Sequence, residues 1–212
     1  IVRPDTALQA EAIAAWAPKL ADLPRPFLGV LVGGPSSPIA FSTEDGARLL
    51  HRMIALRHTH GGALLVACGP RTPPSVREIL ERGLKAEDRH RLFGWPPPQP
   101  NPYPAVLGLA DRFLVTCDSA PMIAAACVSG KPVEVFRLDM PDYLSRLSSR
   151  GLGLSIDARR RRRQRRGLPP DGLDRLRDWL VTRDLLTPYR DMRDFLHILE
   201  QKRVIDEDAT TN

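Results

Sequence analysis

The feature that most constrains the fold is a series of apolar runs that each end in a turn of small or polar residues. Residues 27–32 and 63–68 contain no polar side chain apart from Cys68, and 90–95, 113–116 and 131–136 give three further candidates. A strand without alternation of polar and apolar residues is typical of a parallel sheet that is buried on both faces. Helical patterns lie between the runs. The sequence therefore predicts an α/β fold, with a doubly wound parallel sheet.

Helices are predicted before the first strand and between successive strands. Apolar residues at helical spacing indicate helices over 7–20, 43–58, 76–80, 106–110 and 119–130. Beyond the fifth strand two further helices are expected, at 172–182 and 189–202. This order divides the chain into a linker helix (1–26), a Rossmann-like domain (27–148), a basic and mobile loop (149–170) and a helical tail (171–212).

The positive charge of the chain comes from one short block. The net charge is +6, but seven arginines lie within eight positions, and without them the rest of the chain carries −1. A solvated loop is the simplest interpretation. An anionic membrane surface is the second, ahead of nucleic acid because no aromatic side chains lie within the block to stack on bases. The arginines are Arg159, Arg160, Arg161, Arg162, Arg163, Arg165 and Arg166.

The remaining composition points to a cytoplasmic protein. No stretch approaches the roughly 18 apolar residues of a membrane-spanning helix, and Arg3, Asp5 and Glu11 interrupt any signal-peptide core. The three cysteines include no closely spaced pair, so reduced cysteines in the core are expected. We expect a cytoplasmic location, with attachment to the inner face of a membrane as the alternative.

Chemistry is expected where the loops leave the carboxyl ends of the strands, because ligands of doubly wound sheets bind there. Backbone N–H groups of Gly33, Gly34 and Ser36 can approach a phosphate, and Arg71-Thr72 adds a cation to the same end. Trp95, followed by a proline-rich loop, offers a wall on which a base could stack. Asp118-Ser119 precedes a helix whose free N–H groups attract anions.

Each of these signals also has a structural interpretation. The two glycines can simply form a tight turn, Asp118 or Ser119 can cap the following helix, and Arg71 can be a solvated cation. No P-loop or GxSxG elbow is present. His58 and His60 end a helix, and no nearby acidic residue completes a metal site, so no metal is expected.

In combination, however, these motifs resemble those of the "elongated mitochondria" fission-type family, whose bacterial members are described as glycosyltransferases. The resemblance covers about residues 1–137. It rests on Leu31-Val32-Gly33-Gly34-Pro35-Ser36, Arg71-Thr72-Pro73-Pro74, Asn101-Pro102-Tyr103, Asp118-Ser119 to Met122, and Gly130-Lys131-Pro132-Val133.

The resemblance implies the carboxy-terminal, donor-binding half of a GT-B glycosyltransferase, in which two Rossmann-like domains face each other. It implies a nucleotide-sugar substrate, no metal cofactor, and a further Rossmann-like domain before this segment, so the chain is expected to be inactive alone. Under this resemblance, the donor diphosphate and sugar would be lined by Gly33, Gly34, Ser36, Arg71, Thr72, Asp118, Ser119 and Met122.

One departure from the family pattern stands out. Ala125 occupies the position where the family usually carries a glutamate that would accept ribose hydroxyls. This departure favours a second hypothesis, a non-catalytic Rossmann-like interaction module at a membrane surface. A nucleotide-sugar epimerase-like enzyme is a third, since that chemistry also occurs on this architecture.

Overall fold

The computed structural model describes residues 6–36, 39–138, 159, 162–163, 166–176, 199, 201 and 205. Most residues of the two helices predicted at 172–182 and 189–202 lie outside this part of the chain, as do Arg160, Arg161 and Arg165. The chain divides into two compact units, one that contains the sheet and one that contains residues 140–191. Each unit is described separately below.

The sheet unit is built on five parallel strands in the order β3-β2-β1-β4-β5. The chain runs outward from β1 to β3 and then crosses back to place β4 on the other side of β1. This is the doubly wound arrangement that the sequence predicts. The strands are β1 (Phe27–Val32), β2 (Ala63–Cys68), β3 (His90–Phe93), β4 (Arg112–Thr116) and β5 (Val133–Phe136).

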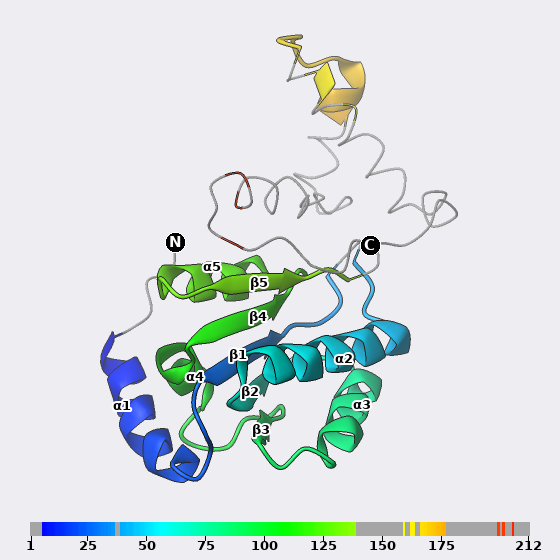
Figure 1. The fold of residues 1–212 in the computed structure, drawn as a ribbon. Coiled ribbons are helices and arrows are strands. Elements are labelled where there is room, and N and C mark those ends of the chain that lie inside the picture. Colours follow the sequence, from blue (N-terminus) through cyan, green and yellow to red (C-terminus); the bar gives the residue numbers. More distant parts are fainter. Residues whose placement is uncertain are drawn as a thin grey trace. The chain divides into compact units, whose positions relative to one another are not determined.

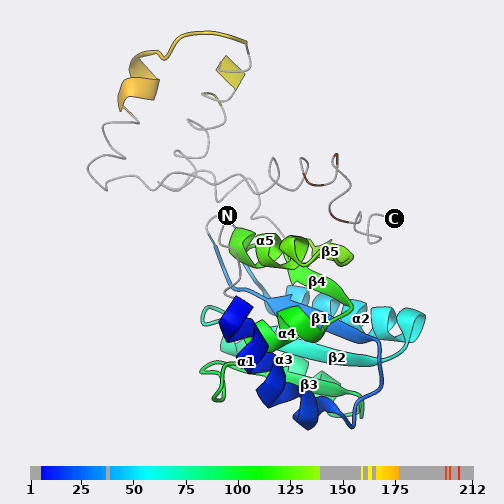
Figure 2. The same cartoon turned by 90° about the vertical axis from the view of Figure 1, so that its left-hand side faces the viewer.

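Helices cover both faces of the sheet (Figures 1 and 2). Helices α2 and α3 pack against each other on one face, and α1 packs against α4 on the opposite face, as right-handed crossovers require. A capping box between Ser42 and Asp45 fixes the start of α2. The helices are α1 (Thr6–Trp16), α2 (Thr43–His60), α3 (Pro74–Leu84), α4 (Tyr103–Leu109) and α5 (Ala120–Val128), and a 3-10 turn (Ala17–Leu20) follows α1.

Proline and glycine set the boundaries that differ from the predicted ones. Strand β3 ends at Phe93 rather than at Trp95, because Gly94 and Pro96 follow. Strand β5 begins at Val133, since Pro132 lacks the N–H group needed to donate within a sheet. Helix α4 begins earlier than expected because its first turn accommodates proline.

The predicted linker helix packs on the sheet unit. The ring of Trp16 meets the ring of Phe93 edge-on at 5.0 Å, and its indole N–H donates to the carbonyl of Pro100 at 2.9 Å. Gln9 also donates to the carbonyl of Pro104 at 3.5 Å. These contacts join α1 to the end of β3, to the long loop that follows it and to α4.

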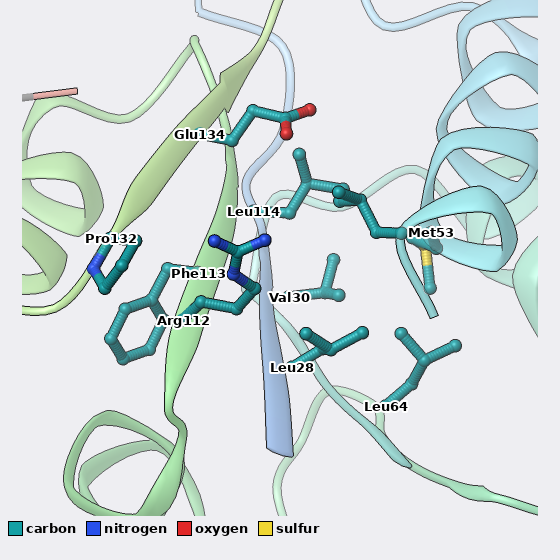
Figure 3. A pocket seen from close by; sticks show the side chains of 10 residues that line it. Leu28, Val30, Met53, Leu64, Arg112, Phe113, Leu114, Pro132 and Glu134 are labelled. Carbon is teal, nitrogen blue, oxygen red and sulfur yellow. The ribbon is translucent and has the colours of Figure 1, made fainter. Parts of the chain in front are cut away.

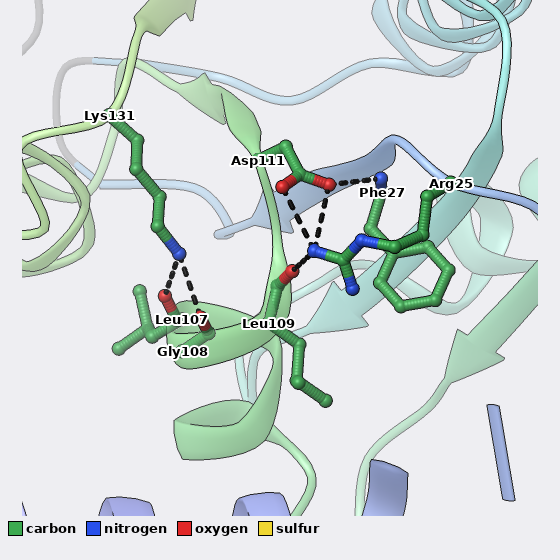
Figure 4. A network of polar contacts seen from close by, with 7 residues as sticks. All are labelled: Arg25, Phe27, Leu107, Gly108, Leu109, Asp111 and Lys131. Atoms are coloured by element: carbon green, nitrogen blue, oxygen red, sulfur yellow. Dashed lines mark hydrogen bonds and ion pairs between the residues drawn. The ribbon is translucent and has the colours of Figure 1, made fainter. Parts of the chain in front are cut away.

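Hydrogen bonds connect several elements at the amino ends of the strands (Figure 4). The carboxylate of Asp111 accepts from Arg25 at 2.9 and 3.0 Å and from the N–H of Phe27 at 2.7 Å. Arg25 also donates to the last carbonyl of α4, at Leu109. The ammonium group of Lys131 donates to the carbonyls of Leu107 and Gly108 at 3.3 and 2.8 Å. Two cations therefore satisfy the end of α4, where the helix dipole is negative.

A small cavity lies beside this end of the sheet, between α2 and strands β1, β4 and β5 (Figure 3). Its volume of about 20 Å³ has room for about one water molecule. Glu134 lies at its rim and forms a two-bonded ion pair with Arg52, at 2.5 and 2.7 Å. Arg112 lies at the same rim and contacts the ring of His60.

The second unit differs from the predicted loop. Arg159, Arg162 and Arg163 are helical, and a further helical segment covers residues 172–176. The reason is that a carboxylate pairs with two of the arginines. Asp171 forms an ion pair with Arg159 at 2.7 Å and with Arg163 at 3.6 Å. The sequence of the arginine block alone does not predict this order, because the order depends on an aspartate that follows the block.

Candidate functional site

The candidate site lies at the carboxyl ends of β1, β2 and β4. Strands β1 and β4 are neighbours, yet the chain leaves them toward opposite sides of the sheet. Their loops therefore diverge and leave a crevice, which is the usual ligand position in doubly wound sheets. The loop after β1 begins with Gly33 and the loop after β4 carries Asp118, so the predicted residues of both loops meet at this point.

Hydrogen bonds tie these two loops together. The N–H of Gly33 donates to the hydroxyl of Thr116 at 2.8 Å, and the N–H of Gly34 donates to Asp118 Oδ2 at 2.7 Å. The sequence predicts these two N–H groups as phosphate donors, and that interpretation needs correction. In this conformation the protein itself uses both groups, because β4 lies next to β1 and one acceptor comes from its last residue and the other from the loop that follows.

The glycines are required because the loops approach one another closely. A Cβ atom on Gly33 would lie 2.0 Å from Asp118 Oδ2, and one on Gly34 would lie 2.0 Å from the carbonyl oxygen of Arg71. No side chain fits at such distances. The two residues therefore bring three loops into contact, which is one of the roles that glycine has in ligand-binding turns.

The loop after β2 contributes Arg71 and Thr72. The buried hydroxyl of Thr72 contacts the carbonyls of Val32 and Gly33 at 3.0 and 2.6 Å, so it fixes this loop to the end of β1. Arg71 is exposed next to Gly34, and its positive charge acts on Asp118. Thr72 is thus a structural link, whereas Arg71 presents a cation to solvent at the crevice.

Asp118 is the most unusual residue of the cluster. It is 96% buried, and its Oδ1 atom has no hydrogen-bond partner among the described residues. Burial raises the pKa of Asp118, while hydrogen bonds from Thr116 and Gly34 and the charge of Arg71 act in the opposite direction. An unpaired oxygen of this kind is costly in a folded protein, and such groups concentrate at functional sites.

The alternative that Asp118 or Ser119 caps α5 is confirmed for the position of Ser119 but wrong for both side chains. Ser119 occupies the N-cap position, but no side chain bonds to the first turn of the helix. Asp118 instead faces the loop after β1. Pro121 lacks an N–H group, so the backbone donors left at this helix end are those of Ala120 and Met122.

An apolar hollow of about 200 Å³ adjoins the cluster, on the side of β2 and β3. Trp95 lies on its wall with its side chain 45% exposed. Gly69 connects the hollow to the cluster, since its N–H donates to the carbonyl of Val32 at 2.8 Å. The lining residues are Ala67, Cys68, Gly69, Pro70, Phe93, Gly94, Trp95, Pro97, Asn101, Pro102, Tyr103 and Met122.

The structure thus brings together most of the predicted site residues. Gly33, Gly34, Arg71, Thr72 and Asp118 form one bonded or contacting cluster, as described above. Ser119 and Met122 continue it along the first turn of α5, and Trp95 and Met122 line the hollow. Ser36 follows in the loop after β1, where it is half-buried and forms an isolated β-bridge.

Sequence reasoning missed several residues of this region. Thr116 is the last residue of β4, and its hydroxyl accepts a hydrogen bond from the N–H of Gly33. This contact becomes evident only once β4 is known to lie next to β1. Phe93 and Tyr103 line the hollow, and the Asn101-Pro102-Tyr103 motif was a usable signal for the second of them. Burial raises the pKa of Tyr103 to about 12, so its hydroxyl stays protonated at neutral pH.

Cysteine and histidine chemistry is not apparent at this end of the sheet. Cys68 and Cys117 are buried free thiols, and burial raises their pKa values to about 12 and about 11. His60 lies at the opposite end, beside Arg112. Within the described residues, no three side chains of the metal-ligating types come together.

A parallel 3-2-1-4-5 sheet with a polar cluster at its switch point defines a Rossmann-like α/β protein. More specifically, the family model described as "Mitochondrial fission ELM1" matches residues 3–158, and the chain belongs to this family. Within the described part of the chain, no helix has the length and apolar character needed to cross a bilayer.

Two similar proteins place this chain in a longer context. The "Mitochondrial fission protein ELM1" of Arabidopsis thaliana is 31% identical over 135 residues, which are 64% of this chain and 31% of the plant protein. The chain thus matches about a third of the length of that relative. A structure of S. aureus MnaA with UDP aligns with a TM-score of 0.40 and 18% identity, over 92% of this chain and 50% of MnaA.

Proposed function

We propose that the chain binds a nucleotide sugar at the carboxyl end of the sheet, as the donor half of a GT-B-type glycosyltransferase. One observation carries the proposal: an exposed cation and a helix N-terminus meet at the β1–β4 switch point, and an apolar hollow adjoins them on the side of β2 and β3. No metal is part of the proposal, because Arg71 and the end of α5 supply the positive potential that a diphosphate needs.

The hollow would hold only the base of the nucleotide sugar, and its size supports this placement. A volume of about 200 Å³ is below the roughly 300–1,000 Å³ that is usual for sites enclosing a whole drug-sized ligand. It suits one ring system, with Trp95 as the stacking wall. The diphosphate and sugar would then extend over Arg71 and Ser119.

In the proposed reaction, the bond between the sugar C1 and the diphosphate oxygen breaks as the acceptor oxygen attacks C1. Negative charge develops on the departing diphosphate. Arg71 and the N–H groups at the start of α5 would offset that charge, which is the electrostatic contribution expected of such a site. The acceptor and the base that takes its proton would come from the facing domain of a GT-B protein, so this chain alone would bind without turnover.

A titration tests the proposal. UDP, GDP, ADP and CDP, each raised to millimolar concentration, should shift the amide NMR signals of the loops after β1, β2 and β4. Arg71→Gln should weaken binding about tenfold or more, as expected for losing a charged phosphate contact. Arg82→Gln is the matched control, since Arg82 is exposed on α3 and pairs only with Glu78 among the described residues; it should bind like the wild type.

A non-catalytic interaction module is the alternative, and two observations favour it. Ala125 on α5 offers no carboxylate for ribose, and the N–H groups of Gly33 and Gly34 are already used. If none of the four nucleotides shifts the spectrum, the donor-site proposal is wrong and this alternative stands. If a nucleotide binds, analysis of the products formed by the two-domain protein separates transfer from epimerisation.

A further inference from the structure

The second unit contains a short ordered motif within the arginine-rich region. The helical turn at Arg162 and Arg163 ends where the N–H of Leu168 donates to the carbonyl of Arg163 at 3.0 Å. Two prolines follow, and a new helical segment begins after Asp171. The chain therefore doubles back within a few residues.

Two aspartates organise this motif. Asp171 Oδ1 accepts from the N–H groups of Leu173 and Asp174 at 3.1 Å, and Asp174 accepts in return from the N–H of Asp171 at 3.0 Å. This reciprocal pattern is a capping box. Arg159 and Arg163 form their ion pairs with the same aspartates. Asp174 is buried and Asp171 half-buried, whereas Arg159 stays exposed while it pairs with Asp171.

The other arginines and three leucines face solvent. Arg162, Arg166 and Arg175 are exposed. Five arginines against two aspartates leave the described residues of 159–176 with a net charge of +3. The leucines are Leu168, Leu173 and Leu176, which are 45%, 46% and 50% exposed.

The two kinds of exposed residue lie close together in the sequence, within 162–176. Leu173 and Leu176 are three positions apart and share a helix face. Exposed leucines that lie near exposed cations match a partner that is both anionic and apolar. A bilayer that contains anionic lipids has both properties.

We propose that this motif, the exposed arginines and leucines of 159–176, docks the protein on an anionic membrane surface. The arginines contact the lipid phosphates and carboxylates, and the leucines enter the boundary between headgroups and acyl chains. Nucleic acid also offers phosphates, but it gives three leucines nothing to bury against, and the described motif contains no aromatic side chain for stacking. The inference does not depend on nucleotide-sugar binding at the sheet.

Sedimentation with vesicles tests the proposal on the full chain. The protein should bind vesicles of phosphatidylcholine containing about one third phosphatidylserine, bind pure phosphatidylcholine weakly, and lose binding as salt screens the charges. Neutralising Arg162 and Arg166 together (R162Q/R166Q) should lower the partition coefficient about 25-fold, since each cation near the surface contributes about fivefold. Leu173→Ser with Leu176→Ser should lower it about tenfold.

Matched variants on the sheet unit serve as controls. Arg82→Gln with Arg89→Gln removes two exposed cations, and Leu8→Ser removes a leucine that is 57% exposed on α1. Both should bind vesicles like the wild type, and circular dichroism checks that every variant is folded. Absence of binding to anionic vesicles would overturn the proposal, as would equal losses in the control variants. Preferential binding of a duplex or single-stranded oligonucleotide, unaffected by the leucine changes, would assign the surface to nucleic acid instead.

Discussion

At the amino ends of the strands, both oxygens of Asp111 are hydrogen-bonded and Lys131 satisfies the end of a helix. At the carboxyl ends, one oxygen of Asp118 has no partner among the residues that the structure describes. The cavities beside the two ends also differ in volume: about 20 Å³ near the amino ends and about 200 Å³ near the carboxyl ends. The same sheet therefore has one end arranged for stability and one that keeps unsatisfied groups beside a hollow. This difference supports the proposed position of the site more strongly than any single motif does.

The largest expected effect comes from filling the contact between the loops at the carboxyl end. Gly34→Ala places a methyl group 2.0 Å from the carbonyl oxygen of Arg71, so the backbones of two loops must move apart. We expect a loss of about 3 kcal/mol in the free energy of unfolding, measured by urea denaturation. Gly46→Ala is the control. Gly46 lies inside α2, and a Cβ there would make an ordinary 3.4 Å contact with Val76 of α3. The free energy of unfolding of this variant should rise by about 0.5–1 kcal/mol. Equal midpoints for Gly34→Ala and the wild type would contradict the close approach.

The second prediction concerns the amino end. Asp111→Ala removes the acceptor of Arg25 and leaves the half-buried N–H of Phe27 without its partner. We expect a loss of about 1–2 kcal/mol, with nucleotide binding unchanged. Asp88→Ala, which removes an 86% exposed carboxylate with only a 3.8 Å contact to Arg89, should change stability by less than about 0.5 kcal/mol. Reduced nucleotide affinity in Asp111→Ala would show that the two ends are not separable.

A smaller effect is expected from the cap of α4. Lys131→Met keeps the aliphatic stem but removes both hydrogen bonds to the helix carbonyls. The expected loss is about 0.5–1 kcal/mol. Lys85→Met provides the comparison, since Lys85 is an exposed lysine just after α3, and thermal unfolding should not distinguish it from the wild type. If Lys131→Met behaves in the same way, the cap contributes nothing to stability.

The pH dependence sharpens the contrast further. Because burial raises the folded-state pKa of Asp118 above its unfolded value of 3.8, the folded state binds the proton more tightly. Its protonation should therefore stabilise the fold as the pH falls from 7 toward 4. The variant Asp118→Asn cannot titrate at this position and serves as the reference. Over that pH range, the free energy of unfolding of the wild type should rise relative to that of Asp118→Asn.

Glu44 supplies the opposite sign. Its backbone N–H, followed by Thr43 and Ser42, holds its pKa below the ordinary value, so its contribution to stability should disappear as the pH falls. As the pH falls, the free energy of unfolding of the wild type should therefore fall relative to that of Glu44→Gln. A rise, as expected for Asp118, would show that the two pKa shifts do not have opposite signs.

The sequence predicts the strands well and the detailed bonding poorly. Runs such as 27–32 and 63–68 match β1 and β2 at both ends, because only a strand buried on both faces needs so continuous an apolar stretch. The convergence of the βα loops also follows from parallel topology. The use of the Gly33 N–H by Thr116 does not, because it depends on which strands are neighbours, and strand order is a property of the whole chain.

The three-way connection at the switch point has an entropic consequence. Thr72 fixes the loop after β2 to β1, and Gly33 and Gly34 fix the loop after β1 to β4. A ligand that settles on this scaffold need not order three segments first, so little of its contact energy is lost to freezing the backbone. Affinity at such a preorganised scaffold would then depend mainly on the two side chains that project from it, Arg71 and Trp95.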